Sequence, residues 1–463
     1  MQQQPQALQP PFDNTLSRAR RSVELGLVLL AGIITASAYV LASLGERASM
    51  PARIVPFMVF VLSLLVVTHV VVRFVARGAD PLLLPTAALL HGLGYVMIAR
   101  LSDHWAGLQA TWSLVGVAAF ALTLFFVERP SDLQNYQYTS LALGLGLLLL
   151  PMVPGIGFTS GGARIWVSVG PINFQPGEFA KILLAVFFAA YLAERRELIV
   201  QGHTKILGVT LPELRHLAPI LVAWAVSVVV MVGEKDLGSS LMFFTLFVVM
   251  LWVATERTSF LVMGIGLFVG GAVIAYNLFS HVQTRVEIWL NPWDQYTERG
   301  YQPIQALFAL ANGGMGGTGL GLGDPAAIPA AHNDFIFAAL GEELGLLGTT
   351  AVLAAFVLLV GAGMRTALRA QKEFDKLLAT GLTTIVAVQT FIIIGGVLRV
   401  VPLTGVTLPF MSYGGSSLVA NYVLLAILVR ISDTTARGLH EVPDEASPSE
   451  RFAAWRTRKA EAK

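Results

Sequence analysis

The stretch HNDFIFAALGEELG, residues 332–345, places three carboxylates at the beginning of an apolar segment. Asp334 stands first, and Glu342 and Glu343 follow it. An aspartate at the mouth of a membrane helix can act as a general base and take the proton of a substrate hydroxyl. Asn333 or Asp334 can instead cap a helix N-terminus, where side-chain oxygens accept bonds from free N–H groups. This stretch alone leaves both interpretations open.

The two glutamates stand too far from Asp334 to share its chemistry. Glu342 is eight residues beyond Asp334, which is about 12 Å along a helix that rises 1.5 Å per residue. Glu343 projects from the opposite side of the same helix. We therefore expect both glutamates to pair with polar groups inside the protein or to fix helix packing.

A second candidate is GARIWVSVGPINFQPGEFAK, residues 162–181. Glu178 and Lys181 lie one turn apart on the same face of a helix that Pro176 opens, and Arg164 precedes them in a glycine-rich stretch. Arg164 and Lys181 could bind an anionic substrate group. A structural ion pair between Glu178 and Lys181 is the alternative. For Arg164 the alternative is an incidental charge beside Trp166, an aromatic anchor at the membrane interface.

Three other stretches could complete such a site. In the turn GEKD, Lys235 could contact a substrate, and Asp236 is placed either to do the same or to cap the following helix. The polar loop 280–333 is longer than loops without a binding or covering role usually are. In RVVPLTGVTLPFMSYGGSS, Arg399 precedes two prolines and a Gly-Gly pair. Broken backbone at membrane depth needs a protein or water partner, so this stretch implies a cavity.

Composition identifies the elements that must position these residues. Hydrophobic residues make up 55% of the 463-residue chain, charged residues 13%, and the mean hydropathy is +0.68, whereas soluble domains have about 25% charged residues. We therefore predict an all-α polytopic membrane protein. The chain has no cysteine, which excludes disulfides and thiol nucleophiles. Arginines precede the first apolar run without a small-residue cleavage site, so we expect a retained first helix.

Apolar segments of about 20 residues predict about twelve transmembrane helices. We expect them near 23–44, 52–74, 80–100, 108–127, 137–155, 176–194, 217–233, 236–255, 258–279, 335–363, 378–398 and 413–431. Most of the 31 Lys and Arg residues then fall on one side, which places both termini in the cytoplasm. The loops 156–175, 280–333 and 399–412 are expected on the outer face.

This pattern divides the chain into four parts. Residues 1–22 are expected to be a disordered cytoplasmic N-terminus, and 23–74 two transmembrane helices. Residues 75–431 form a membrane core with the large outer loop 280–333, and 432–463 a cytoplasmic tail.

The motifs also occur in a familiar order. GARIW with FQPGEFAK, KDLGSS, NPWD with GYQ, HNDFIFAALGEELG, and PLTGVTLPF with SYGGSS follow one another here. In this order the chain resembles the SEDS family of RodA, FtsW and SpoVE over about residues 80–431, and within it the actinobacterial RodA/FtsW-like branch. The resemblance implies a core of ten helices, to which residues 23–74 add two.

The resemblance implies a peptidoglycan glycosyltransferase, a multi-pass protein of the plasma membrane that serves cell elongation or division. Such an enzyme polymerises lipid II at the outer face, releases undecaprenyl diphosphate and works with a class B penicillin-binding protein, a transpeptidase. Its other partners would be the growing glycan strand and the membrane, and no nucleic acid is expected. A lipid II flippase is the alternative, because charges inside a membrane also mark transport paths. We see no inverted repeat of the kind many transporters have, which favours the polymerase.

The family's residues are carried over onto matching positions only. Its essential aspartate falls on Asp334, which is expected to be the catalytic base, its loop arginine on Arg164, and the lysine of QP-x-E-x-x-K on Lys181. The residues expected to contact the substrate are Arg164, Lys181, Glu178, Lys235, Arg399 and His332. A divalent cation could help to neutralise the diphosphate. The sequence shows no dedicated metal site, so the cofactor stays unknown.

The chain departs from the family pattern in three places. Ala330 and Ala331 stand where the family often has Glu-Ala, so a role for that glutamate is not carried over. Ile165 occupies an often basic position, and Glu234 with Lys235 replaces the common Gln-Pro.

Overall fold

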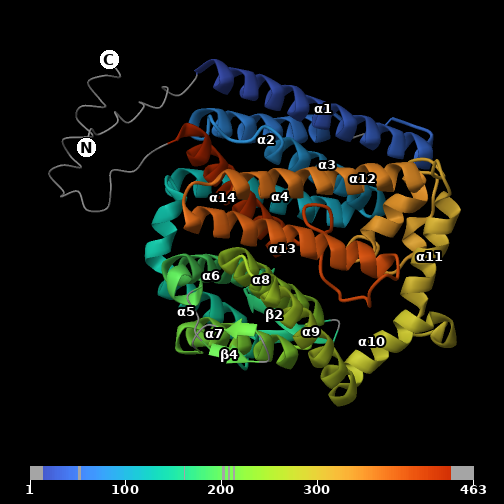
Figure 1. Cartoon of the computed structure of the whole chain (residues 1–463). Helices are drawn as coiled ribbons and strands as arrows, with labels where there is room; N and C mark the ends of the chain where they lie inside the picture. Colours follow the sequence, from blue (N-terminus) through green and yellow to red (C-terminus); the bar gives the residue numbers. More distant parts are fainter. Residues whose placement is uncertain are drawn as a thin grey trace.

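The computed structural model describes residues 14–50, 54–160, 162–170, 172–200, 204–206, 209–211 and 214–438. These residues form a bundle of long helices that run side by side, with two small β-sheets (Figure 1). The predicted all-α polytopic membrane fold is confirmed. Of the expected disordered end 1–22, residues 1–13 lie outside the described residues, whereas residues 14–22 belong to the first helix, which begins at Asn14. Of the expected tail 432–463, residues 439–463 lie outside the described residues, and the last helix continues to Arg437.

The helices of the first half are α1 (Asn14–Arg47), α2 (Ile54–Val75), α3 (Leu83–Leu101), α4 (Asp103–Phe126), α5 (Gln137–Leu149), α6 (Gly177–Val200), α7 (Leu214–Gly233) and α8 (Leu237–Thr255). Those of the second half are α9 (Thr258–Leu278), α10 (Ser280–Leu290), α11 (Tyr301–Gly313), α12 (Ile336–Arg369), α13 (Glu373–Val397) and α14 (Gly415–Arg437). Short 3-10 turns are η1 (Pro130–Tyr136), η2 (Leu150–Met152), η3 (Pro292–Gln295) and η4 (Pro325–Ala327).

The long helices match the predicted spans closely. Among the described residues, nine helices are long and apolar enough to cross a membrane: α1 to α4, α8, α9, α12, α13 and α14. The predicted spans 137–155, 176–194 and 217–233 correspond to α5, α6 and α7, which are shorter or more polar. The number of twelve crossings therefore stays a prediction. The multi-pass membrane architecture is confirmed.

Charged pairs tie the connections of one end of the bundle together. The Arg365 guanidinium donates to both carboxylate oxygens of Asp80, at 2.8 and 2.9 Å. The Gly78 N–H donates to Asp433 at 2.6 Å, and Arg196 pairs with Glu373 at 2.9 Å. The start of α3, the α12–α13 turn and the end of α14 thus share one end, as the predicted topology requires.

The predicted outer loop 280–333 is largely helical, which corrects the sequence-based expectation. It contains α10, η3, α11 and η4. One face of α11 is buried through Pro303, Ile304, Ala306 and Ala309, and this face holds the segment against the bundle. The short length of α11 and its many polar neighbours hid the helical period from sequence analysis.

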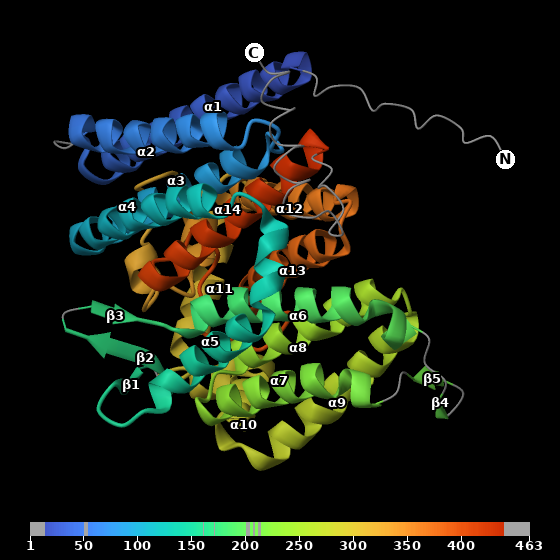
Figure 2. The same ribbon diagram turned by 90° about the vertical axis from the view of Figure 1, so that its left-hand side faces the viewer.

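The strands form two separate small sheets. Strands β1 (Gly157–Ser160), β2 (Ala163–Val169) and β3 (Ile172–Phe174) form an antiparallel sheet in the order β1-β2-β3. Strands β4 (Thr204–Ile206) and β5 (Val209–Leu211) form a hairpin. Figure 2 shows the two sheets at opposite ends of the bundle. The stretch with Arg164 is therefore a folded sheet at the end opposite β4 and β5.

The core of the bundle is built around α13 and α14, whose residues are mostly buried. Gly94 lets α3 approach the backbone of the α13–α14 connection, because a Cβ there would lie 2.3 Å from the Met411 carbonyl oxygen. Gly415 in α14 allows the Trp112 ring to pack closely in the same way, because a Cβ on Gly415 would lie 2.2 Å from that ring. These contacts bring the PLTG–SYGG stretch into the interior, next to the end of the bundle that carries Asp334.

Candidate active site

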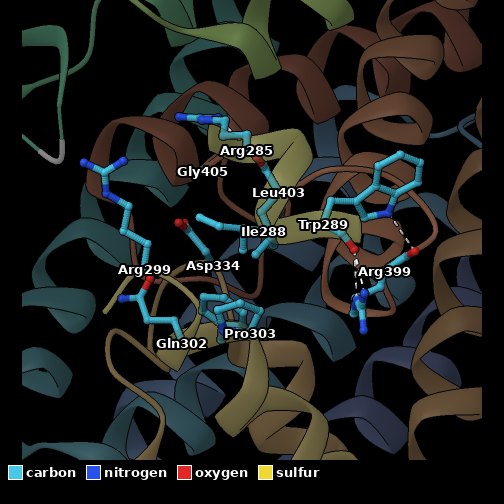
Figure 3. A pocket seen from close by; sticks show the side chains of 12 residues that line it. Arg285, Ile288, Trp289, Arg299, Gln302, Pro303, Asp334, Arg399, Leu403 and Gly405 are labelled. Atoms are coloured by element: carbon cyan, nitrogen blue, oxygen red, sulfur yellow. Dashed lines mark hydrogen bonds between the residues drawn. The ribbon is translucent and has the colours of Figure 1, made fainter. Parts of the chain in front are cut away.

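A cavity of about 240 Å³ opens beside Asp334. Its walls are α10, the turn before α11, the start of α11 and the α13–α14 connection (Figure 3). The lining residues are Arg285, Ile288, Trp289, Arg299, Gln302, Pro303, Asp334, Phe335, Gly396, Arg399, Leu403 and Gly405. Asp334 is the one carboxylate in this lining, and three of the other residues are arginines.

Asp334 faces the cavity and does not cap a helix. The cap position of α12 is Phe335, and no side chain caps this helix. The turn before α12 is held from outside instead, since the Tyr413 N–H donates to the His332 carbonyl at 2.8 Å and the Ser412 hydroxyl to the Asn333 carbonyl at 2.6 Å. The connection to α14 therefore positions the aspartate.

Arginine charges shape the electrostatics of the carboxyl. Burial raises the pKa of Asp334 to about 6, and the positive charge of Arg285 limits this rise. Burial also lowers the pKa of Arg285, while the charges of Asp236 and Asp334 oppose that shift. A carboxyl with a pKa near 6 is mostly ionised at neutral pH and can still accept a proton, which suits a general base.

Two of the three cavity arginines also hold the cavity wall. Arg285 donates to the carbonyls of Leu403 and Thr404, at 3.2 and 2.8 Å. Arg399 donates to the Trp289 carbonyl at 2.6 Å, and the Trp289 indole N–H returns a bond of 2.9 Å to the Arg399 carbonyl. These reciprocal bonds fix α10 to the α13–α14 connection.

Arg299 is the most accessible of the three. Its guanidinium donates to the Thr284 hydroxyl at 3.2 Å, a neutral partner, and the side chain is exposed. In Figure 3 the Asp334 carboxyl lies between the side chains of Arg285 and Arg299, whereas Arg399 lies beside Trp289. Arg299 can therefore bind an anion without giving up a structural bond to the backbone.

Lys181 and Glu178 form a buried ion pair away from the cavity lining. The Lys181 ammonium lies 2.6 Å from the Glu178 carboxylate and 2.8 Å from the Gln389 side-chain oxygen, and the lysine is 1% exposed. The two residues therefore form the structural ion pair that was one of the two interpretations of the sequence. This pair joins α6 to α13. Both side chains are satisfied inside the bundle and neither lines the cavity, so contact of either with a substrate stays a prediction from the sequence.

Arg164, Lys235 and His332 also lie outside the cavity lining. The Arg164 guanidinium donates to the Pro151 carbonyl at 2.9 Å and so holds β2 to η2. Lys235 is exposed in the turn before α8, where Asp236 caps that helix through a 3.0 Å bond from the Ser239 N–H. His332 stacks on Trp105 with ring centroids 4.8 Å apart. Of the residues expected from the sequence, the structure brings Asp334 and Arg399 together.

Arg285 and Arg299 line the cavity but are not among the site residues expected from the sequence. Both stand in the segment 280–333, close to the NPWD and GYQ motifs, and that proximity was the available signal. Within the described residues, no group of three or more His, Asp or Glu side chains is arranged to hold a metal ion. The arginines are the cationic groups that this cavity supplies.

The family follows from a comparison with known proteins. The family described as "Cell cycle protein", FtsW/RodA/SpoVE, matches residues 80–437. The chain belongs to this family. The FtsW/RodA/SpoVE match begins just before α3, so α1 and α2 precede it, as the sequence motifs indicated.

Relatives of this chain in the FtsW/RodA/SpoVE family have curated names. The peptidoglycan glycosyltransferase RodA of Mycobacterium tuberculosis is 45% identical over 457 residues, which cover 96% of each chain. The probable peptidoglycan glycosyltransferase FtsW of Geobacter metallireducens is 35% identical and covers 70% of this chain and 84% of that protein. The mycobacterial similarity thus extends over α1 and α2.

Solved structures of the family share the fold. A chain from a study described as "Structural coordination of polymerization and crosslinking by a peptidoglycan synthase complex" matches with a TM-score of 0.64 and 26% identity, covering 77% of this chain and 98% of that one. RodA of Thermus thermophilus matches with a TM-score of 0.55 and 24% identity, covering 77% and 97%. The FtsW/RodA/SpoVE core is therefore similar across the three chains.

The buried ion pair makes a stability prediction. Lys181→Met should lower the free energy of unfolding by about 3–5 kcal/mol, because it leaves the buried Glu178 carboxylate without its partner. The double variant Glu178→Gln/Lys181→Met should recover most of this loss. Thermal unfolding in detergent measures both, with Lys235→Met as the exposed-lysine control. A single variant as stable as the parent protein would contradict the structural assignment.

Proposed function

We propose that this chain is a peptidoglycan glycosyltransferase that polymerises lipid II at the outer face of the cytoplasmic membrane. The observation that carries the proposal is the cavity in which a single carboxylate, Asp334, stands among three arginines. Identity of 45% to a curated peptidoglycan glycosyltransferase RodA over nearly the whole chain supports the same activity. Transfer of a sugar from a lipid diphosphate needs a base and positive charges close together, and this cavity contains both kinds of group.

The proposed reaction is a single displacement between two lipid-linked sugars. The 4-hydroxyl of an incoming lipid II attacks the anomeric carbon of the growing strand and forms the new glycosidic C–O bond. The bond to undecaprenyl diphosphate breaks, and the diphosphate leaves with the bonding electrons. Asp334 takes the hydroxyl proton. A site with one base and no second carboxylate as nucleophile favours inversion at the anomeric carbon, by analogy with glycosidases.

The arginines are proposed to stabilise the departing diphosphate. Guanidinium groups bind phosphate oxygens in a bidentate fashion and act strongly in a site shielded from water. Arg299 is the primary candidate, because its side chain is exposed and bonded to a hydroxyl only. Arg285 and Arg399 contribute their fixed charges from the wall. Arg164, Lys181 and Lys235 lie outside the lining, so we assign the diphosphate to the cavity arginines instead.

A class B penicillin-binding protein is the proposed partner. Polymerised strands must be crosslinked by a transpeptidase, and a structural relative comes from work on polymerization and crosslinking by a peptidoglycan synthase complex. Co-purification of this chain with its native transpeptidase would identify the partner. The proposal places the cavity on the outer face, where both lipid II and a transpeptidase domain are accessible.

Asp334→Asn should abolish polymerisation and leave a folded protein. Removal of a general base typically costs about 10²–10⁴-fold in rate. Folding raises the pKa of Asp334, so the ionised carboxylate opposes folding at neutral pH, and the asparagine variant should be at least as stable as the parent. Labelled lipid II with the purified protein and its partner gives the polymer yield.

A near-normal polymer yield from Asp334→Asn would refute the base assignment. Reconstitution of the parent protein in vesicles with labelled lipid II separates a polymerase from a flippase. Transbilayer movement of labelled lipid II without polymer from the parent protein would favour the flippase.

The pH profile should report the Asp334 carboxyl. The carboxylate form predominates above pH 6 and is lost below it, so the rate should fall about tenfold per pH unit on the acid side. Arg285→Gln removes the charge that limits the pKa, so this limb should move to higher pH. Arg285→Lys keeps the charge and should leave the limb near its original position. An unchanged limb in Arg285→Gln would show that another group titrates.

Arg299→Gln should weaken the use of lipid II more than it alters the fold. Loss of a charge-assisted phosphate contact should raise KM by about tenfold, and Arg299→Lys should recover part of it because lysine is a point charge without the planar fork. Arg369→Gln, an exposed charge at the far end of α12, is the matched control. Equal KM values for Arg299→Gln and Arg369→Gln would exclude the diphosphate contact.

A further inference from the structure

Helix α12 is broken at Gly345, and another segment repairs the break. Gly345 has φ +65°, so the helix consists of two halves. The residues 313–324, here called the glycine-rich segment, lie against this break. The Thr318 and Gly319 N–H groups donate to the carbonyls of Glu342 and Glu343, at 2.9 and 3.0 Å. On the other side of the break, the Leu346 N–H donates to the Gly314 carbonyl at 2.9 Å.

This joint is made of backbone and has no room for side chains. A Cβ on Gly345 would lie 2.2 Å from the Gly317 nitrogen, and a Cβ on Gly317 would lie 2.2 Å from the Glu343 carbonyl oxygen. The glycine-rich segment is therefore a structural part of α12, and its glycines allow this close approach.

The two glutamates of α12 hold the rest of the segment, as expected from the sequence. A Glu343 carboxylate oxygen accepts from the Gly321 N–H at 3.0 Å, and Glu342 accepts from the Asp324 N–H at 3.3 Å. Arg100 of α3 lies 3.4 Å from the other Glu343 oxygen and donates to the Gly323 carbonyl at 3.2 Å. Charged side chains and backbone hydrogen bonds thus both hold the glycine-rich segment to α12.

Helix α1 covers the exposed side of the same segment. A Cβ on Gly45 would lie 2.2 Å from the Leu320 carbonyl oxygen, and a Cβ on Gly321 would lie 2.1 Å from the Ala42 carbonyl oxygen. Arg100 extends the contact, since it lies 3.7 Å from the Glu46 carboxylate of α1 as well. Helix α1 precedes the part of the chain that the family shares, yet its backbone touches the segment directly.

We propose that α1 is a positioning element of the active site. Its residues 42–46 pack against the glycine-rich segment and hold it in the break of α12. Arg100 contacts α1, the segment and α12, and it is therefore a positioning residue. The segment connects α11, which lines the cavity with Gln302 and Pro303, to the turn that carries Asp334. The first half of α12 begins two residues after Asp334, so α1 helps to fix the position of the base.

The catalytic consequence rests on the proposed function. A displacement of about 1 Å between base and substrate can cost about 10²-fold in rate. A loosened segment would change the placement of Asp334. Arg285 and Arg399, held by bonds between α10 and the α13–α14 connection, and Arg299, bonded to Thr284 of α10, would keep their contact with the substrate. Turnover should therefore fall and KM should stay nearly constant.

Gly45→Val tests the proposal in the full-length chain. The side chain collides with the Leu320 carbonyl, whereas Gly26→Val is the matched control, because a Cβ on Gly26 of α1 meets nothing within 4 Å. Hydrogen exchange of the amides at 318–321, followed by mass spectrometry, should speed up by about tenfold or more in Gly45→Val and not in Gly26→Val. With lipid II, kcat should fall by about tenfold at a KM within about twofold of the parent value.

Glu46→Gln is the second variant, and it should fold because Glu46 is a partly exposed side chain that loses only its charge. Its exchange should rise in the same amides. Parent-like exchange in both variants would overturn the contact between α1 and the segment. Faster exchange with unchanged kcat would overturn the positioning role. A parent protein without polymerase activity would refute the proposed function, and the exchange data would still decide whether α1 holds the segment.

Discussion

Charges and free backbone groups inside a membrane bundle need protein partners, because hydrocarbon supplies none. This constraint explains most of the polar contacts between the helices. The Lys181 ammonium donates to Glu178 and Gln389. Arg365 donates two hydrogen bonds to the Asp80 carboxylate. Asp334 instead lines a cavity, which agrees with its proposed role as the base.

The same constraint governs the broken backbone around Asp334. The α13–α14 connection has carbonyls without helical partners. Arg285 donates to the carbonyls of Leu403 and Thr404, and the Trp289 indole donates to that of Arg399. In return, the Arg399 guanidinium donates to the Trp289 carbonyl of α10. The arginines thus close the wall and supply positive charge in one arrangement. The proposed reaction uses this combination, since it places positive charge for the diphosphate at a fixed distance from the proposed base.

The arrangement of charges also distinguishes polymerisation from transport. A carrier requires polar groups along its whole path and two states of access. Here the Lys181–Glu178 pair is satisfied by its own bonds and by the packing of α6 on α13, while the three cavity arginines line the same cavity as Asp334 at one end of the bundle. The Lys181–Glu178 pair thus stabilises the bundle, whereas the charges proposed to meet the substrate line one cavity.

Sequence alone determined the membrane class, most helix positions and the family, and it singled out Asp334 as the candidate base. Hydrophobic length and local motifs are properties of short stretches, so they can be recognised without a fold. The asparagine and aspartate before α12 also suggested a cap, and only the structure showed Phe335 in that position with Asp334 directed to the cavity. The helices inside 280–333 escaped recognition because α11 buries only one short face.

Tertiary structure decided which cations accompany Asp334. Arg285 meets Thr404 from 119 residues away along the chain, and no local pattern encodes such a contact. Lys181 has the right residue type and family motif for phosphate binding, yet the packing of α6 on α13 buries it against Glu178 and Gln389. Residue type limits what a side chain can do, but long-range packing sets its neighbours, and the neighbours decide whether a charge stabilises the bundle or faces a substrate.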